Sequence, residues 1–212
     1  MTTAVAAAEL KALGRREGLD AVGIAPADPF DGTRQDLLDR RAAGLHGGMN
    51  FTYRNPERST DPGRAVAGAR SIVVGARRYA APARTSRGAR VAAYATDDHY
   101  RALRQSLDAI ALHLRASGWV ARVLVDDNAL VDREAAVRAG LGWYGKNANV
   151  LLPGHGSWFV LGSVVTTAPL DADSAPVADG CGTCRRCIDG CPTAAIVAPG
   201  VVDARRCLAW LL

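Results

Sequence analysis

Four of the five cysteines in this 212-residue chain lie within one short segment, CGTCRRCIDGCP. Their spacing, CxxCxxCxxxCP, lets the thiolates of one tight loop surround an iron-sulfur cube, and the proline ends the loop. The spacing therefore predicts a [4Fe-4S] site whose ligands are Cys181, Cys184, Cys187 and Cys191.

Two other uses of these cysteines are less favoured. A structural zinc site usually draws its four ligands as two separated pairs. Disulfides suit secreted chains, and nothing else in this sequence indicates secretion. In proteins with two cubes the fourth cysteine of such a run ligates the other cube, and only Cys207 follows downstream. A second cube would therefore lack ligands within this chain.

Composition places the chain among globular proteins. Its length allows one substantial core, or a main domain with a small appendage, and 49% of its residues are apolar. The net charge of +5 comes almost wholly from arginine, because the only lysines are Lys11 and Lys146. Arginine suits bidentate contacts with phosphate, so a nucleic acid or a phosphate-bearing cofactor is one reading of the charge. A genome biased toward arginine codons is the other.

The N-terminal segment is rich in alanine without being a signal peptide. Glu9 and Lys11 interrupt any apolar run and no basic start precedes them, so an amphipathic helix is expected. No segment approaches the roughly twenty apolar residues of a membrane span. With every cysteine assigned to metal chemistry, we expect a cytoplasmic protein.

Apolar patterns predict strands that alternate with helices. Beyond the N-terminal helix, the expected helices cover residues 33–43, 98–117 and 130–139. The expected strands cover residues 20–25, 71–75, 91–94, 120–125, 149–152 and 157–166, the last two joined at PGHG. Residues 44–64, rich in glycine, aromatic and charged side chains, predict a structured loop over a site. The alternation predicts an α/β domain over residues 1–170, followed by a cluster domain over residues 171–212 that opens with a polar linker.

Several motifs, in order along the chain, resemble the epoxyqueuosine reductase family. They are LHGGMNF, NPER, DPGRAVAGARSIVV, VDDNALVDREAAVRAGLGWYGKN, GSWFVLG and CGTCRRCIDGCPTAAIVAPGVVDARRCLAWL. The resemblance covers nearly the whole chain. It implies an enzyme with a cobalamin-binding α/β catalytic domain followed by a partial ferredoxin-like [4Fe-4S] domain.

The family's reaction is the reduction of epoxyqueuosine to queuosine at the wobble position of tRNA. Two [4Fe-4S] clusters pass electrons to a cobalamin whose cobalt carries no nucleotide base. By resemblance, the partners are a tRNA with a GUN-type anticodon that carries epoxyqueuosine and an electron donor of unknown identity. The expected protein is a monomer that does not bind membranes.

The reaction needs an acid, because an epoxide oxygen that leaves as an alkoxide must take up a proton. The resemblance assigns this role to Asp126, at a predicted strand end, in the register set by Arg133 and the GLGWYGKN block. Asp127 stands where the family usually has threonine. Without the resemblance, a loop aspartate at a strand end is more often a cap or turn residue.

A corrin ring needs an apolar floor with backbone donors, which the glycine-rich residues 142–162 can supply. By resemblance, the residues of this cobalamin site are Asp126, Lys146, Asn147, Val150, Ser157 and Leu161. For Val150 and Leu161 the alternative is simple packing between strands.

Two features depart from the family pattern. The family's YARGxDYH motif is YATDDHY here, with threonine in place of arginine and the last aromatic and histidine exchanged. The chain also stops before the family's second cysteine motif, so it reads as a truncated member. By resemblance, a first cluster takes Cys181, Cys184 and Cys187 and a second takes Cys191 and Cys207, each with ligands from the missing part.

Two other function classes stay open. A ferredoxin-like electron carrier would need only the cluster domain, so the size of the preceding domain argues against it. A cobalamin-dependent reductive dehalogenase shares the cofactor pair, and the VDDNALVDRE and GLGWYGKN blocks favour the tRNA enzyme over it.

Overall fold

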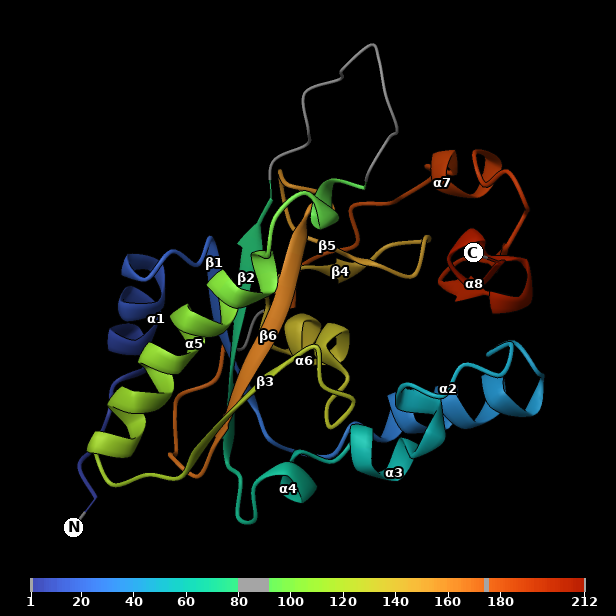
Figure 1. Cartoon of the computed structure of the whole chain (residues 1–212). Helices are drawn as coiled ribbons and strands as arrows, with labels where there is room; N and C mark the ends of the chain where they lie inside the picture. The colour runs from blue at the N-terminus through green and yellow to red at the C-terminus, as the bar shows by residue number, and fades with distance from the viewer. Residues whose placement is uncertain (1, 80–91, 174–175, 212) are drawn as a thin grey trace.

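A four-stranded antiparallel sheet forms the centre of the protein, in a computed structural model that describes residues 2–79, 92–173 and 176–211 (Figure 1). Its strands, in spatial order, are β1 (Ala21–Pro26), β2 (Ser71–Arg78), β6 (Phe159–Thr166) and β3 (Ala121–Val125). β2 and β6 occupy the two central positions, and β-branched residues supply much of both, as expected for strands covered on two faces.

Helices cover both faces of this sheet. α1 (Ala7–Arg16) and α5 (His99–Ala116) lie on one face, and α6 (Asp132–Arg138) lies on the other (Figure 1). α5 turns its apolar stripe toward the strands at the three- and four-residue spacing predicted from the sequence. The fully buried side chains of that stripe are Leu103, Leu107, Ile110 and Leu114.

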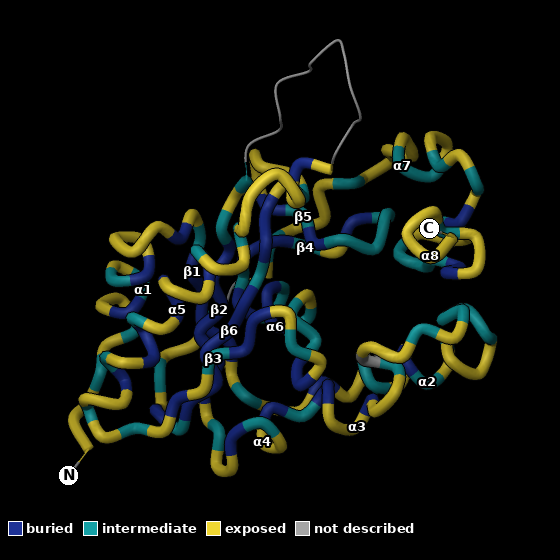
Figure 2. Tube along the Cα trace, in the orientation of Figure 1, coloured by how far each residue is buried: buried dark blue, intermediate teal, exposed yellow. Residues whose placement is uncertain are grey.

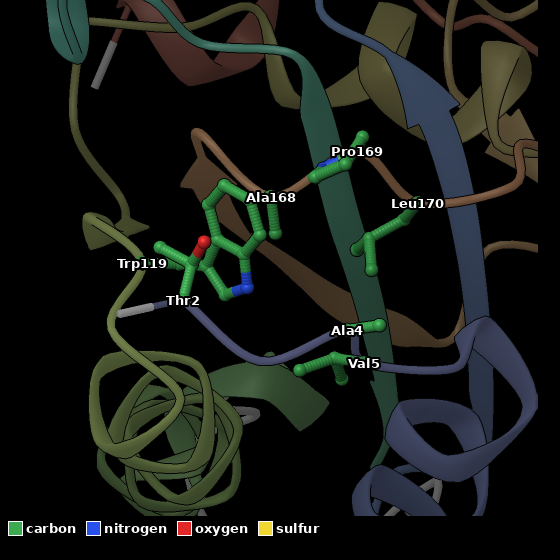
Figure 3. A pocket seen from close by; sticks show the side chains of 7 residues that line it. All are labelled: Thr2, Ala4, Val5, Trp119, Ala168, Pro169 and Leu170. Atoms are coloured by element: carbon green, nitrogen blue, oxygen red, sulfur yellow. The ribbon is translucent and has the colours of Figure 1, made fainter.

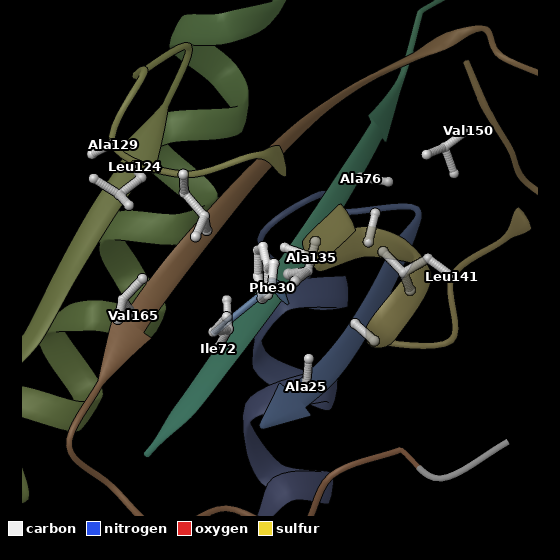
Figure 4. Packing of buried hydrophobic residues seen from close by; sticks show 14 of the residues in the cluster. Ala25, Phe30, Ile72, Ala76, Leu124, Ala129, Ala135, Leu141, Val150 and Val165 are labelled. Carbon is white, nitrogen blue, oxygen red and sulfur yellow. The ribbon is translucent and has the colours of Figure 1, made fainter. Parts of the chain in front are cut away.

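Side chains that alternate along β2 divide the core into two clusters. Ile72 and Ala76 pack on the α6 face, in the cluster around Phe30 that Figure 4 shows. Val73 packs on the other face with residues of α1 and α5. Figure 2 shows the strands as a buried layer between helices whose outer surfaces are exposed. The period of two along the strand therefore serves both faces of the sheet.

Two glycines paired across the centre of the sheet let α5 approach closely. Gly75 of β2 lies opposite Gly162 of β6 in the ladder. A Cβ atom at Gly162 would lie 2.7 Å from the Leu107 side chain, and one at Gly75 would lie 3.1 Å from it. Both distances are short for carbon atoms in contact, so the glycine pair forms the space that Leu107 fills.

The C-terminal part of the chain docks beside the sheet. It contains α7 (Arg186–Asp189), the hairpin of β7 (Ile196–Ala198) and β8 (Val201–Val202), the 3₁₀ helix η3 (Ala204–Arg206) and α8 (Leu208–Leu211). In Figure 1 this part lies near a second hairpin, β4 (Trp143–Tyr144) with β5 (Val150–Leu151), and near α2 (Asp31–Ala42). The Trp210 indole N–H donates to the carbonyl of Gly47 at 2.6 Å, which ties α8 to the segment after α2.

The predicted linker at the start of this part is attached to the sheet. The Asp173 backbone N–H donates to the carbonyl of Ile24 at 2.8 Å, and the Asp173 carboxylate accepts the Ile24 N–H at 2.8 Å. The same carboxylate pairs with Lys11 of α1. The chain is therefore bound to β1 as far as Asp173, and the domain division after residue 170 stays a prediction.

The mixed helix and strand class predicted from the sequence is confirmed, and two local predictions are wrong, namely the strand over residues 91–94 and the loop without helices over residues 44–64. Of the strand expected over residues 91–94, Ala93–Ala95 form the 3₁₀ helix η2, and residue 91 lies outside the described residues. The two strands expected around PGHG are both present as β5 and β6, and Leu152 and Gly156 form an isolated antiparallel bridge across this turn. Beyond the bridge, β5 pairs with β4, and β6 pairs with β2 and β3. The expected loop over residues 44–64 contains short helices.

Those short helices are η1 (Thr52–Arg54), α3 (Pro56–Ser59) and α4 (Pro62–Ala65). The side chain of Asn55 caps α3 by accepting the Arg58 N–H at 3.0 Å, and Asp61 caps α4 in the same way. A proline occupies the first position of each helix, where its missing N–H costs nothing. No helix in the described part of the chain combines the length and apolar character of a membrane span.

Candidate functional site

Asp126 follows the last residue of β3, at the end of the sheet where β6 begins. Val125 pairs with Gly162, and the antiparallel ladder between β3 and β6 ends there. The backbone of Asp126 has a φ of 51°, in the left-handed region that non-glycine residues adopt only occasionally. The residue is exposed, and its carboxylate forms no hydrogen bond or ion pair with any residue that the structure describes. It is available to a ligand.

The neighbouring Asp127 is engaged within the protein. Its Oδ1 accepts the backbone N–H of Ala129 at 2.9 Å, which makes a local turn. Its carboxylate also lies 3.6 Å from the guanidinium of Arg122 and 4.0 Å from that of Arg58. Of the two adjacent aspartates, Asp127 is thus the turn residue and Asp126 the unpaired acid.

Two titratable residues close to Asp126 escaped the sequence analysis. Asp132 begins α6, and its Oδ1 is buried without a hydrogen-bond partner among the described residues. Burial, and then the charges of Asp126 and Asp127, raise the pKa of Asp132 to about 8, against the opposing charge of Arg133. Burial, and then the charges of Asp126 and Asp132, raise the pKa of Tyr100. Both residues lie in quoted motifs, VDDNALVDRE and YATDDHY, but only the fold brings their side chains close to Asp126.

Val150 and Leu161 pack in one apolar cluster on the α6 face of the sheet. Val150 is 2% exposed on β5, and Leu161 is partly buried on β6. Gly162 faces α5 on the opposite side, and a Cβ at Gly142 would collide with the carbonyl of Leu151 at 2.1 Å. The glycines of residues 142–162 therefore serve close packing in different places, and their part in a cobalamin site stays a prediction.

The other predicted cofactor residues lie in loops at the same end of the sheet. Lys146 and Asn147 occupy the turn between β4 and β5, where the Asn147 side chain accepts the backbone N–H two residues later at 3.1 Å. Arg133 of α6 holds this turn by donating to the carbonyl of Ala148 at 3.1 Å. Ser157 lies just before β6 and is partly exposed.

The β4–β5 hairpin contacts the cysteine segment directly. The Lys146 ammonium donates to the carbonyl oxygens of Gly182 at 2.7 Å and Cys184 at 3.0 Å. The Trp143 indole N–H donates to the Sγ of Cys181 at 3.5 Å. Lys146 is thus bonded to the loop that carries the first cysteines.

Cys191 has the hydrogen-bonding environment of a metal-ligating thiolate. The Sγ of Cys191 accepts the backbone N–H of Ala195 at 3.2 Å, and this bond together with one from Ile196 lowers the pKa of Cys191 to about 7. The remaining cysteines, all free thiols, are Cys181, Cys184, Cys187 and Cys207. Among the residues that the structure describes, no three His, Cys, Asp or Glu side chains converge as a metal site. The donor chemistry fits an iron-sulfur cluster, and the distribution of thiols between clusters stays a prediction.

Two cavities lie away from these residues. One of about 280 Å³ is lined by residues of the segment before α1, by Trp119 and by Ala168, Pro169 and Leu170 after β6, as Figure 3 shows. The other, of about 410 Å³, is lined by Lys11, Arg15 and Asp173 together with residues that follow α6. Neither cavity includes a residue predicted to bind cofactor or to act in catalysis.

Comparison with known proteins shows what this chain resembles. A family model described as a 4Fe-4S double cluster binding domain matches residues 180–212. An epoxyqueuosine reductase from Gloeobacter violaceus is 40% identical over 214 residues, which cover 96% of this chain and 65% of that protein. This chain is a homologue of the epoxyqueuosine reductases. Another homologue, the epoxyqueuosine reductase of Bacillus anthracis, is 32% identical and is covered over 53% of its length.

Solved epoxyqueuosine reductases share the fold of this homologue. A crystal structure of epoxyqueuosine reductase with an epoxyqueuosine-modified tRNA-Tyr stem loop superposes with a TM-score of 0.87 at 32% identity, over 96% of this chain and 56% of that one. The present chain therefore spans between about half and two thirds of the length of these relatives. A catabolic reductive dehalogenase solved with 3-bromo-4-hydroxybenzoic acid has a TM-score of 0.64 at 21% identity, which shows a likeness of fold alone.

Proposed function

We propose that this chain carries the catalytic part of an enzyme that reduces epoxyqueuosine to queuosine in tRNA. The observation that supports it most is the match to epoxyqueuosine reductases over 96% of the chain, combined with an unpaired carboxyl, Asp126, at the end of the sheet. In the reaction, two electrons and two protons enter, two C–O bonds of the epoxide break, a C=C bond forms and water leaves. The protein must supply a proton, an electron path and a place for the substrate.

Asp126 is the proposed proton donor. Its exposed carboxyl can approach a substrate oxygen, whereas the carboxylate of Asp127 is engaged in a local turn. Two further groups that hold protons at neutral pH lie close by, because Asp132 has a pKa of about 8 and the pKa of Tyr100 is raised. A donor backed by protonated neighbours can recover its proton after it has given it to the departing oxygen.

The proposed cofactors are cobalamin and [4Fe-4S] clusters. Bound cobalamin would supply a reduced metal nucleophile and the clusters would supply single electrons, which side chains cannot. For cobalamin we assign apolar contacts to Val150 and Leu161 and polar contacts to Asn147 and Ser157. Lys146 lies between this group and the cysteine loop, where its hydrogen bonds link the two. For the clusters we assign Cys181, Cys184 and Cys187 to one and Cys191 and Cys207 to the other.

The proposed partners are a tRNA with a GUN-type anticodon and an electron donor of unknown identity. The net charge of +5, held mainly by arginine, favours contact with a phosphate backbone. We place the protein in the cytoplasm, where its tRNA substrate is available. We expect it to be a monomer.

The Asp126→Asn variant tests the proton role. Protein reconstituted anaerobically with iron, sulfide and cobalamin is given an epoxyqueuosine-bearing stem loop and a chemical reductant, and queuosine is measured by nucleoside mass spectrometry. We expect kcat to fall about 10²- to 10⁴-fold, the usual worth of a positioned acid. Asp127→Asn is the matched control and should retain most activity, because Asp127 serves the turn.

The cobalamin site is tested in the same preparations. Wild type and Asp126→Asn should both shift the visible spectrum of cobalamin to its base-off form. A spectrum identical to that of free cobalamin would refute the proposed function, and equal rates for wild type and Asp126→Asn would refute the role of Asp126. A halogenated phenol added in place of the stem loop distinguishes a dehalogenase, since only that enzyme would release halide.

A further inference from the structure

The indole ring of Trp143 lies against the start of the cysteine loop. A Cβ atom at Gly180 would stand 2.7 Å from the Trp143 ring, so only glycine allows the ring this position. The Trp143 N–H then meets the Sγ of Cys181 at 3.5 Å, within hydrogen-bonding range for sulfur. Trp143 is partly buried, which limits competition from water.

A second contact holds the same loop from the other end of the hairpin turn. The Lys146 ammonium binds the carbonyls of Gly182 and Cys184, and the Lys146 carbonyl accepts the N–H of Gly200 at 3.0 Å. These bonds join the turn to two separate parts of the C-terminal segment. The β4–β5 hairpin therefore fixes where Cys181 stands relative to the sheet.

We propose that Trp143 is a positioning residue for Cys181, whose sulfur it holds by an N–H···S hydrogen bond, and that this bond raises the reduction potential of the cluster that Cys181 ligates. The inference rests on the proposed function in one respect, the assignment of Cys181 as a cluster ligand. Reduction adds negative charge to the cluster and its sulfurs. An N–H dipole aimed at one of these sulfurs stabilises that charge, and hydrogen bonds to sulfur are among the determinants of cluster potential.

The Trp143→Phe variant removes the N–H and keeps an aromatic ring against Gly180. The matched control is Trp119→Phe, because the Trp119 indole donates to the carbonyl of Thr3 at 2.8 Å, in the N-terminal segment. Both variants and wild type are reconstituted with iron and sulfide without cobalamin, and the midpoint potential is measured by redox titration followed by electron paramagnetic resonance. This readout does not depend on enzymatic activity.

We expect a lower midpoint potential for Trp143→Phe and an unchanged one for Trp119→Phe. A tenfold fall in the ratio of reduced to oxidised cluster at fixed solution potential corresponds to about 59 mV for one electron. Equal potentials in wild type and Trp143→Phe overturn the proposal. A wild-type chain that retains no iron and sulfide overturns it as well.

A second measurement examines the Lys146 contact. Lys146→Met removes both hydrogen bonds to the loop carbonyls, so a chelator should remove iron several-fold faster than from wild type. Identical rates of iron loss would contradict a positioning role for the hairpin. The proposed function fails separately: a shifted potential without formation of queuosine would retain the role of Trp143 and reject the reaction.

Discussion

Replacing Asp132 with asparagine should remove the fall in stability that Asp132 causes between pH 5 and pH 8, whereas the rise from Cys191, whose pKa is lowered to about 7, is the same in wild type and variant. The pKa of Asp132 is about 8 in the folded protein against an ordinary value of 3.8. Across this window the folded chain keeps a proton that the unfolded chain has released. The free energy of unfolding should therefore be highest at low pH and fall as pH rises, by up to about 1.4 kcal/mol per pH unit.

The expected difference is large compared with the opposing effects. Over three pH units the linkage amounts to about 4 kcal/mol at most, a substantial part of the roughly 5–15 kcal/mol that stabilises a typical domain. The start of α6 favours an ionised carboxylate by only about 0.3–1 kcal/mol. Arg133 acts in the same direction, whereas Asp126 and Asp127 repel a charge on Asp132, and Tyr100 stays neutral throughout the window. Burial of an unpartnered Oδ1 decides the sign.

The assay is urea unfolding of metal-free, reduced protein, followed by circular dichroism at each pH unit from 5 to 8. Asparagine keeps the shape of the side chain but does not titrate. The slope of the free energy of unfolding against pH is compared, because a constant difference in stability between the variants does not affect it. The matched control is Asp31→Asn, since Asp31 also begins a helix and its side chain is 73% exposed. Parallel pH curves for wild type and Asp132→Asn would refute the reasoning, as would an equal change of slope in the control.

Two further substitutions test the packing around the site. Gly162→Ala sets a Cβ 2.7 Å from Leu107 and should destabilise the fold by about 1–3 kcal/mol in urea unfolding. The control Gly32→Ala, whose Cβ would have nothing within 4 Å, should be neutral or slightly stabilising. Equal effects of the two substitutions would show that the Leu107 side chain moves aside at little cost. Asp173→Ala leaves the Ile24 N–H without its side-chain acceptor and Lys11 without its partner, so it should cost about 1–3 kcal/mol and speed amide hydrogen exchange at Ile24. Unchanged exchange there would mean that residues 171–180 do not depend on this contact.

Local chemistry in the sequence was enough to predict most elements. The apolar spacing of α5 and the β-branched run of β2 each follow from one short window. Strand pairing was not predictable in this way. β2 and β6 pair although more than eighty residues separate them in the sequence, and β5 pairs with β4, which was not predicted as a strand. The short helices α3 and α4 did have a local signal, an Asn or Asp cap followed by proline, which the abundance of glycine nearby obscured.

The candidate site was predictable from the sequence only where its residues belong to motifs with a defined spacing. The cysteine run and Asp126 could be proposed as site residues because ligand spacing and motif order point to them. The burial of Asp132 and the contact of Trp143 with Cys181 depend on elements that meet only in the folded chain. The turn role of Asp127 was likewise not readable from the sequence, because it follows from the contacts of Asp127 with Arg122 and Ala129 in the folded chain.

The contacts around the β4–β5 turn connect the proposed proton donor with the proposed electron path. α6 begins beside Asp126, and its second residue, Arg133, holds the carbonyl of Ala148 in the turn. Lys146 in that turn holds the carbonyl of Cys184. Each contact is a hydrogen bond from a charged donor, stronger than a neutral one and directional. A shift of α6 would therefore move the acid and the cysteine loop together, which keeps proton delivery and electron delivery in register at one end of the sheet.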